Sequence, residues 1–393
     1  MSDKIVRTVC VKLDVGQHDA VLTATMRAFN EAATWIAQVC WSEKISNTNT
    51  AHHRVYQETR ARFGLGSQLA VCARAKAVEA IKAGKQRMKA TCPTFSARGA
   101  VRYDARTFRL MSLDRVSLST MGPRIVCRML PGPHQHALLV DPAWQIGGAE
   151  LVWREGVYSL HITQNREAPA TTGSSGGVLG VDLGRAELAT DSDGEHYSGA
   201  KVKGMRAYHR ARRRIVQKVG THSARRKLRT TKRRESRFTS NTNHVISKAL
   251  VTKAALSCKE LALEDLTGIR GANVRHDQRT EHHSWSFYQL RLLVAYKAAA
   301  AGVPLVLVDP AYTSQACSGC GHCERANRRS QSVFLCRSCG LSINADWNGA
   351  LNIAYRAAVN QHMVPDVPPS KPWVWKTHGA ERRQGQASPF KAG

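Results

Sequence analysis

Four cysteines arranged in two pairs constrain this chain more than any other feature of its sequence. They form Cys317-Ser-Gly-Cys320 and Cys336-Arg-Ser-Cys339, with fifteen residues between the pairs. This spacing is typical of a zinc ribbon, in which four thiolates bind Zn²⁺ tetrahedrally and leave no coordination position open. The sequence therefore predicts a small domain, over residues 312–341, that is held together by one structural zinc ion.

A fifth cysteine leaves the first pair open to a second interpretation. Cys323 follows Cys320 at the same spacing, so that Cys320-Gly-His-Cys323 is also a candidate pair. We prefer Cys317 with Cys320, because Gly321 then follows the first pair just as Gly340 follows the second. The other six cysteines lie in apolar or scattered contexts and are expected to be ordinary thiols.

The charge of the chain restricts its partners. Its 393 residues include 58 Lys and Arg against 29 Asp and Glu, which gives a net charge of +29. Such an excess destabilises a compact protein through self-repulsion unless a polyanion neutralises it. Nucleic acid fits best, since Lys and Arg at phosphates release condensed counterions. A membrane surface is the alternative, but no basic amphipathic helix carries Trp and Phe on its apolar face.

About half of the excess charge lies in one stretch. Residues 201–237 hold sixteen Lys and Arg and a single acid, Glu235. Their clusters fall near helical spacing, which predicts helices that contact phosphates, with a solvated basic face as the alternative. The candidate nucleic-acid-binding residues are Arg212, Arg213, Arg214, Arg225, Arg226, Lys227, Lys232, Arg233 and Arg234.

No segment predicts a membrane span or a signal peptide. The longest apolar run, 298–308, is too short to cross a bilayer and contains Gly302 and Pro304. Eleven cysteines are few for this length, and five of them cluster at metal-ligand spacing, which favours a reducing compartment. We expect a cytoplasmic protein that associates with the nucleoid when it is bound to DNA.

The first half of the chain predicts a β-barrel that is split by helices. Residues 4–13 alternate as a strand does, and residues 17–41 and 67–90 have helical periodicity. Short strands separated by Pro and Gly follow at 107–113, 124–128, 136–140, 150–153 and 157–163. We expect the first barrel strand in 1–14, a helical recognition insertion in 15–97, and the rest of the barrel in 98–170.

A linker and an α/β domain follow. Residues 171–177 are small and flexible, and from 178 onward strands alternate with helices, which predicts a mixed sheet. The expected strands are 178–183, 186–190, 195–199, 258–265 and 303–309, and the expected helices are 205–217, 222–257, 285–301 and 345–357. The tail, 361–393, has five prolines and no period, which predicts disorder.

Three carboxylates stand where a charge is costly unless it is paired or binds a metal. Asp182 and Glu264 each end an apolar strand, and Asp346 begins a helix seven residues after the last cysteine. Carboxylates that converge from different elements can hold two Mg²⁺ ions for phosphodiester hydrolysis. Each could instead be a helix or turn cap. Asp265 is a weaker rival to Glu264, because neighbouring strand residues point to opposite faces.

The three segments that carry these carboxylates resemble the split nuclease motifs of RuvC-type domains. More narrowly, the chain resembles the transposon-encoded TnpB proteins and the related compact type V CRISPR effectors. The segments that support this resemblance are VLGVDLG (178–184), LALEDL (261–266), WSFYQLRLLVAYKAAAAGVPLVLVDP (285–310), YTSQACSGCG (312–321) and CRSCGLSINADWNGALNIA (336–354). The first 170 residues match this family only in the layout of a barrel split by a helical insertion.

The resemblance implies a fold and a function. The fold is multidomain α+β: a split β-barrel, then an RNase H-like α/β nuclease over 178–311 and 342–360, with the zinc ribbon inserted between these parts. The function is RNA-guided, Mg²⁺-dependent cleavage of DNA, with Asp182, Glu264 and Asp346 at the family's catalytic positions. The partners are a guide RNA and a target DNA with a short flanking motif, bound by a monomer or by a homodimer on one RNA.

Three other functions remain open at this point. A compact type V CRISPR effector with a crRNA differs from a transposon-encoded protein mainly in genomic context, and we favour the transposon-encoded protein. An RNA-guided repressor that does not cut would be favoured by loss of a carboxylate, but all three are present. A strand-transfer transposase could share the fold, and the ribbon between the second and third carboxylates argues against it.

Overall fold

The computed structural model describes residues 4–86, 91–171, 175–231, 233–266 and 287–360. The chain divides into two compact units, which are described separately. The first unit is made of Met1–Gly176, Ala200–Leu261 and Val274–Leu305, and the second of Gly177–Gly199, Ala262–Asn273 and Val306–Gly393. Within the described ranges, no helix has the length and apolar character that crossing a membrane requires. The predicted disordered tail lies outside these ranges.

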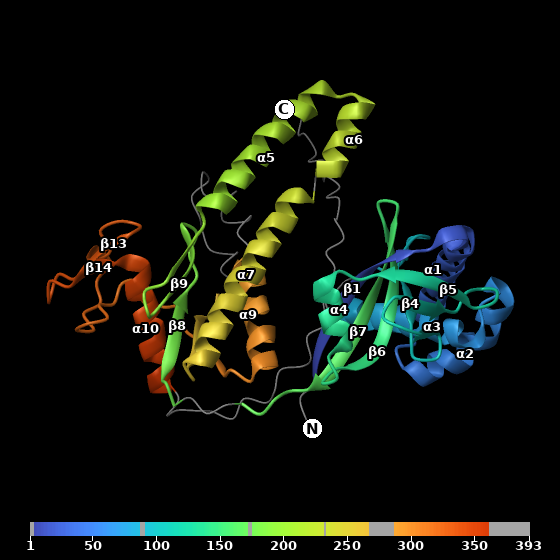
Figure 1. The fold of residues 1–393 in the computed structure, drawn as a ribbon, viewed down its shortest axis with the longest axis horizontal. Coiled ribbons are helices and arrows are strands. Elements are labelled where there is room, and N and C mark those ends of the chain that lie inside the picture. Colours follow the sequence, from blue (N-terminus) through green and yellow to red (C-terminus); the bar gives the residue numbers. More distant parts are fainter. Residues whose placement is uncertain (1–3, 87–90, 172–174, 232, 267–286, 361–393) are drawn as a thin grey trace, which may run out of the picture. The chain divides into compact units, whose positions relative to one another are not determined.

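The first unit contains a seven-stranded antiparallel sheet that forms a near-closed barrel (Figure 1). Its strand order is β2-β6-β7-β1-β5-β4-β3. The strands are β1 (Lys4–Asp14), β2 (Val101–Tyr103), β3 (Phe108–Leu110), β4 (Arg115–Leu118), β5 (Ile125–Leu130), β6 (Gln145–Arg154) and β7 (Val157–Glu167). The N-terminal strand β1 lies between β7 and β5, with Val9, Val11 and Leu13 buried. The first strand of the chain therefore pairs with strands that follow more than a hundred residues later.

Three helices are inserted between β1 and β2: α1 (Asp19–Ser42), α2 (Thr48–Phe63) and α3 (Ser67–Gln86). The periodicity of the sequence predicts α1 and α3 but misses α2. Polar residues dominate α2, and only Ala51, Val55 and Thr59, four residues apart, are buried. Asn47 caps this helix by accepting hydrogen bonds from the backbone N–H groups of Asn49 and Thr50. A capped helix with so narrow a buried stripe has too little apolar signal for detection from the sequence.

One predicted strand is wrong, and two strands were missed. Residues 136–140 belong to the helix α4 (Pro133–Val140), which begins with a proline at its first turn. A short apolar run fits a strand or a helix equally well, so that its periodicity could not decide. The missed strands β2 and β4 are only three and four residues long.

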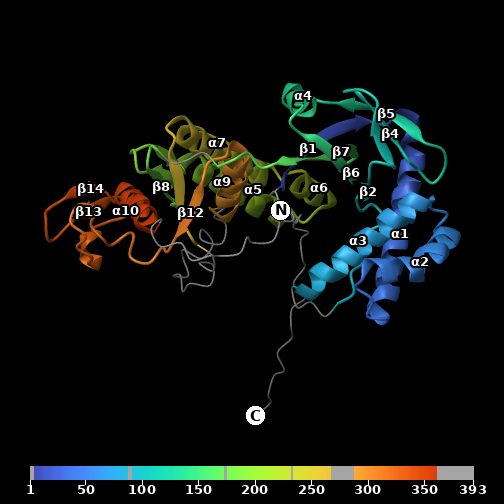
Figure 2. The ribbon, with the colours of Figure 1, turned by 90° about the horizontal axis from the view of Figure 1, so that it is seen from below.

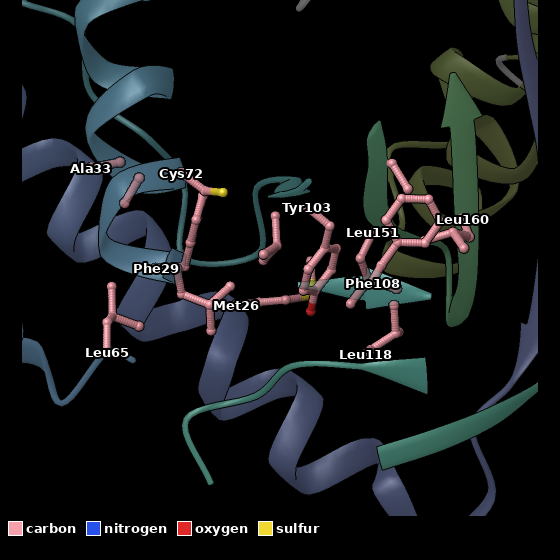
Figure 3. Close-up of a cluster of buried hydrophobic side chains, with 14 of the residues drawn as sticks. Met26, Phe29, Ala33, Leu65, Cys72, Tyr103, Phe108, Leu118, Leu151 and Leu160 are labelled. Carbon is pink, nitrogen blue, oxygen red and sulfur yellow. The ribbon is translucent and has the colours of Figure 1, made fainter. Parts of the chain in front are cut away.

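The barrel and its inserted helices share one hydrophobic core (Figure 3). Met26 and Phe29 of α1 are buried in the same cluster as Tyr103 of β2, Leu151 of β6 and Leu160 of β7. Each of these side chains is no more than 1% exposed. Because apolar burial is the main stabilising contribution to folding, the helices and the barrel are expected to fold together.

Four further helices belong mainly to the first unit: α5 (Ala200–Val219), α6 (His222–Thr231), α7 (Arg234–Leu256) and α9 (Phe287–Ala301). The sequence predicts one helix over 222–257, where the structure has α6 and α7. Helices α7 and α9 pack side by side (Figure 1). Their contact includes Lys297, whose ammonium donates hydrogen bonds to the carbonyl oxygen of His244 and the hydroxyl of Ser247.

A five-stranded sheet forms most of the second unit, with the order β10-β9-β8-β11-β12. Its strands are β8 (Val178–Asp182), β9 (Glu187–Asp191), β10 (His196–Ser198), β11 (Glu260–Glu264) and β12 (Leu305–Val308). β8, β9 and β10 form an antiparallel meander and lie at three of the predicted strands. The N–H of Leu261 donates to the carbonyl oxygen of Pro304, and the N–H of Asp265 donates to that of Val308. The residue numbers increase in the same direction on both strands, so β11 and β12 are parallel.

The helix α10 (Ala345–Asn360) packs on β8 and β9 (Figure 2). Its Ile353 and Ala357 are buried against Ala262 and Val308 of the sheet. The contact is closest at Gly180, where an added Cβ would lie 2.2 Å from the carbonyl oxygen of Ala350. Only glycine permits this approach of two backbones.

We expect Gly180→Ala to lower the free energy of unfolding by about 3 kcal/mol, because the helix must move away from β8 to relieve the overlap. Thermal and denaturant unfolding of the purified protein measure the change. Gly204→Ala on α5 is the matched control, since no heavy atom lies within 4 Å of its added Cβ. It should be neutral or stabilising by up to about 1 kcal/mol. Equal stabilities of the two variants would contradict the close packing.

Candidate zinc ribbon and carboxylate site

Four thiols form one compact cluster in the second unit. The sulfur atoms of Cys317, Cys320, Cys336 and Cys339 all lie within 4.8 Å of one another. Two of the sulfur–sulfur distances are 3.6 Å, far longer than the ~2.05 Å of a disulfide. Zinc–sulfur bonds of about 2.3 Å in a tetrahedron place sulfur atoms roughly 3.8 Å apart. The four predicted ligands therefore have the arrangement of a structural zinc site.

The two halves of the cluster repeat one backbone pattern, which decides between the two candidate pairs. The N–H of Gly321 donates to the carbonyl oxygen of Cys317, and the N–H of Gly340 donates to that of Cys336. Both glycines have a positive φ, of 76° and 77°. Cys323 is exposed and lies outside the four-sulfur cluster. The cluster contains Cys317 and not Cys323, which supports the preference for Cys317 with Cys320.

The rest of the ribbon is built around one buried phenylalanine and one buried asparagine. Phe334, on β13 (Val333–Leu335), packs with Cys317, Cys336 and Ala345, and β13 pairs with β14 (Ser342–Asn344). Asn327 is fully buried: its amide donates to two carbonyl oxygens, and its Oδ1 accepts from the N–H of Arg337. These hydrogen bonds offset the desolvation penalty of burying a polar side chain.

We expect about one zinc ion per chain in protein purified without chelator, as measured by elemental analysis. Cys317→Ser should abolish most of the zinc content, because three thiolates bind zinc far more weakly than four. Cys323→Ser is the matched control and should retain it. Zinc that depends on Cys323 and not on Cys317 would contradict the ligand set.

The three predicted carboxylates come from neighbouring elements of the second unit. Asp182 ends β8 and Glu264 ends β11, and these strands are neighbours in the sheet. Asp346 is in the first turn of α10, which packs on β8. A glycine leaves room for one of them: a Cβ on Gly349 would lie 3.3 Å from Oδ2 of Asp182.

The carboxylates interact electrostatically. Burial, together with the negative charges of Glu264 and Asp346, raises the pKa of Asp182 to about 8. Burial also raises the pKa of Glu264 and of Asp346. A site in which like charges oppose ionisation favours a cation bound among them. Carboxylate oxygens are ligands that suit Mg²⁺, so these residues fit such an ion.

Two residues that sequence reasoning missed are bonded to the carboxylates. The hydroxyl of Thr313, which is 3% exposed, donates to Oε1 of Glu264. The guanidinium of Arg328, in the ribbon, donates to Oδ1 of Asp346 at 3.1 Å. Burial raises the pKa of this carboxyl, and the charge of Arg328 offsets part of that rise. Thr313 stands in a segment that was singled out for its cysteines. Nothing in the sequence separates Arg328 from the neighbouring Arg325 and Arg329.

The competing interpretations of Asp346 and Glu264 can now be compared with the geometry. The cap of α10 is Asn344, whose Oδ1 accepts hydrogen bonds from the N–H groups of Asp346 and Trp347. The carboxylate of Asp346 is therefore not needed as the helix cap. Glu264 is the residue whose charge raises the pKa of Asp182, which favours it over the adjacent Asp265.

The predicted basic residues lie on α5, α6 and the start of α7 in the first unit. Arg213 forms an ion pair with Glu235 at 2.7 Å, and Arg233 forms one with Glu155 at 3.6 Å. Within the part of the chain that the structure describes, no carboxylate lies within 4.0 Å of the others, which are Arg212, Arg214, Arg225, Arg226, Lys227 and Arg234. Lys232 is outside the described residues. Most of this charge is therefore free to meet a polyanion.

One histidine of this stretch is buried. His209 is only 8% exposed, although many of the residues around it are charged. Its ring contacts that of Tyr208, with centroids 5.3 Å apart. It also lines a notch between α5 and α6 together with Arg212, Arg213, Lys227 and other residues. Because so many residues of this stretch are charged, its sequence gives little indication of the few positions that are buried.

We expect the wild-type protein, without added divalent cation, to lose stability relative to Asp182→Asn as pH rises from 5 to 8.5. The folded-state pKa of Asp182 is raised to about 8, above the ~3.9 of an unfolded chain. The preference of the folded state for the protonated carboxyl therefore contributes its full stability below pH ~4. This contribution declines as pH rises and is lost near pH 8. Unfolding temperatures across this range measure it, with Glu31→Gln on α1 as the control. Parallel curves for Asp182→Asn and the wild type would contradict the shift.

Comparisons with known proteins agree with this architecture. Residues 287–353 match the family model described as "Cas12f1-like, TNB domain", a range that includes α9, β12, the ribbon and the start of α10. A Cas12f1 endodeoxyribonuclease of Sulfoacidibacillus thermotolerans is 30% identical over 55% of this chain and 54% of its own length. A putative RNA-guided DNA endonuclease of Escherichia coli, InsQ, is 30% identical over 50% of this chain and 53% of its own.

These similarities define a class of proteins related to TnpB and Cas12f. The chain is similar to proteins of this TnpB/Cas12f family, and the resemblance stated from its motifs is confirmed. It spans about half the length of the curated relatives that it matches.

Solved structures share the fold at low sequence identity. One, described as a Cas12f1–sgRNA–target DNA complex, aligns with a TM-score of 0.61 over 85% of this chain and 82% of that chain, at 15% identity. Another, described as the mini-RNA-guided endonuclease CRISPR-Cas phi3, has a TM-score of 0.53 over 94% of both chains, at 12% identity. The chain therefore has an α+β fold that resembles the Cas12f structures.

Proposed function

We propose that this protein is an RNA-guided DNA endonuclease that cuts its target by Mg²⁺-dependent phosphodiester hydrolysis. The observation that carries the proposal is the placement of Asp182 and Glu264 at the ends of neighbouring strands, with Asp346 in the first turn of the helix that packs on β8. Burial and the charges of Glu264 and Asp346 raise the pKa of Asp182, in agreement with this placement. Three carboxylates that resist ionisation together are poorly suited to holding a fold, but they suit the binding of divalent cations. The relatives are named as endonucleases, and two of those named are described as RNA-guided.

The nuclease domain is proposed to be RNase H-like, of the RuvC type. The support is the strand order β10-β9-β8-β11-β12, in which β8, β9 and β10 form an antiparallel meander at one edge of the sheet. The proposed limits are 178–311 and 342–360 for the nuclease, 312–341 for the ribbon, and 1–14, 15–97 and 98–170 for the barrel and its helical insertion. The proposed linker, 171–177, lies partly outside the described residues.

Asp182, Glu264 and Asp346 would hold two Mg²⁺ ions, which when bound activate water and stabilise the leaving oxygen. The chain's own residues prepare this site. Burial keeps the carboxylates in a low-dielectric environment, where their interactions with charged groups are strong. The ion pair with Arg328 offsets part of the charge of Asp346, and the hydrogen bond from Thr313 orients Glu264.

The proposed partners are a guide RNA and a target DNA. The exposed cations of α5, α6 and α7 would contact phosphates, which position a duplex without reading its sequence. Base pairing with the guide would supply sequence specificity, while the protein reads a short flanking motif. We propose a transposon-derived guide bound by one or two copies of the protein; a crRNA of a compact CRISPR effector is the alternative.

We expect Asp182→Ala to abolish cleavage of target DNA, by at least about 10³-fold, because one of the metal-binding carboxylates is lost. RNA binding should stay within a few-fold of the wild type, because the basic helices are unchanged. RNA that co-purifies with the wild-type protein is sequenced, and a single species ending in a variable segment supplies the guide for the cleavage assay.

Cleavage by Asp182→Ala at the wild-type rate would refute the proposed site. Guided DNA binding without cleavage by the wild-type protein would instead favour a repressor. Absence of any bound RNA would refute RNA guidance. Replacement of Arg225, Arg226 and Lys227 by Gln is the complementary control, since it should weaken RNA binding and leave the carboxylates in place.

A further inference from the structure

Thr313 is the one residue, among those that the structure describes, whose side chain donates a hydrogen bond to the carboxylate of Glu264. Its hydroxyl also lies 3.0 Å from the carbonyl oxygen of Pro310, but it has a single proton to donate. A hydrogen bond to a charged acceptor is roughly twice as strong as one to a neutral acceptor. The proton is therefore assigned to Glu264, with Oε1 occupied and Oε2 left for another partner.

The backbone of Thr313 is held by the helix that carries Asp346. The amide of Asn352, on α10, donates to the carbonyl oxygens of Thr313 and Ala316, both at 2.8 Å. One turn earlier, Asn348 also donates to Ala316 at 2.8 Å and accepts from the N–H of Ser318 at 3.0 Å. Asn348 and Asn352 are buried and four residues apart, so they lie on one face of the helix.

The turn before Thr313 adds a second constraint. Tyr312 has a φ of +64°, in the left-handed region that non-glycine residues rarely adopt. Such a conformation persists only where the surrounding structure over-determines it. Here the asparagine contacts and the hydrogen bond from the N–H of Ala316 to the carbonyl oxygen of Tyr312 supply that determination. The position of the Thr313 hydroxyl is therefore set by α10 and not by a freely moving loop.

We propose that Thr313 is a positioning residue for Glu264. It transmits the placement of α10, through Asn352, to the carboxylate at the end of β11. Asp346 and Glu264 lie on different elements, and hydrogen bonds from Asn352 to Thr313 and from Thr313 to Glu264 join these elements. The same turn leads into Cys317, so the first half of the zinc ribbon is anchored to the helix at the same point. This inference rests on the proposed nuclease function.

The test compares Thr313→Val with Thr313→Ser in cleavage of target DNA by the protein with its co-purified RNA, over a series of Mg²⁺ concentrations. Valine keeps the shape of the side chain and removes the donor, whereas serine keeps the donor. We expect Thr313→Val to lose activity about 10- to 100-fold and to need more Mg²⁺ for half-maximal cleavage. Thr313→Ser should stay within about 3-fold of the wild type, because it retains the hydrogen bond.

Thr59→Val is the matched control. Thr59 is 1% exposed on α2, and its hydroxyl donates to the carbonyl oxygen of Val55 at 2.7 Å. The Thr59→Val substitution removes a buried hydroxyl from the first unit, and it should leave both the cleavage rate and its Mg²⁺ dependence unchanged. Should Thr313→Val fail to fold, as judged by RNA binding and thermal unfolding, Thr313→Ala takes its place with the same expected loss.

Glu264→Gln separates failure of this inference from failure of the proposed function. If the wild-type protein does not cut DNA, the proposed function is wrong. If Glu264→Gln cuts DNA at the wild-type rate, the proposed carboxylate site is wrong. If Glu264→Gln is inactive while Thr313→Val cuts like the wild type with the same Mg²⁺ dependence, only the positioning role is overturned. If serine is no better than valine and both variants are less stable, Thr313 serves packing, which also overturns the inference.

Discussion

The close packing of α10 on β8 is the constraint on which the candidate site depends. Gly180 allows the two backbones to approach within a distance that any Cβ would prevent. This approach brings Asp346, at the start of the helix, next to the strand that ends with Asp182. The same helix then supplies Asn348 and Asn352 to the turn before the zinc ribbon. One packing contact thus positions the carboxylate of Asp346, the turn at Thr313 and the first cysteine pair of the ribbon.

The charges of the site oppose the stability of the fold. Asp182 is held where burial and two other carboxylates raise its pKa, which is an unfavourable arrangement for a structural residue. Functional sites commonly carry such a cost, which the rest of the structure offsets. Here the compensation is local: Asn344 caps the helix, Arg328 pairs with Asp346, and Thr313 bonds to Glu264. The ribbon contributes two of these elements and is therefore part of the support of the site.

The sequence predicted much of this organisation because several of its signals are local. Cysteine spacing and the glycine after each pair are properties of short segments, and they were sufficient to choose Cys317 over Cys323. The alternating pattern of β1 and the periodicity of α1 and α3 are equally local. Prediction failed where the local signal was weak: α2 buries only a narrow stripe, and the short apolar run of α4 fits two periods.

The sequence by itself determined which groups are available: four thiolates, three carboxylates at the ends of apolar elements, and a dense basic stretch. Only the tertiary structure decided how they are combined. That Asn344 and not Asp346 caps α10, that Arg328 among several ribbon arginines meets a carboxylate, and that Thr313 joins Glu264 to the helix all depend on contacts between residues far apart in the chain. The physical reason is that hydrogen bonds and ion pairs act over a few ångströms, and spacing along a sequence does not specify which distant groups come that close.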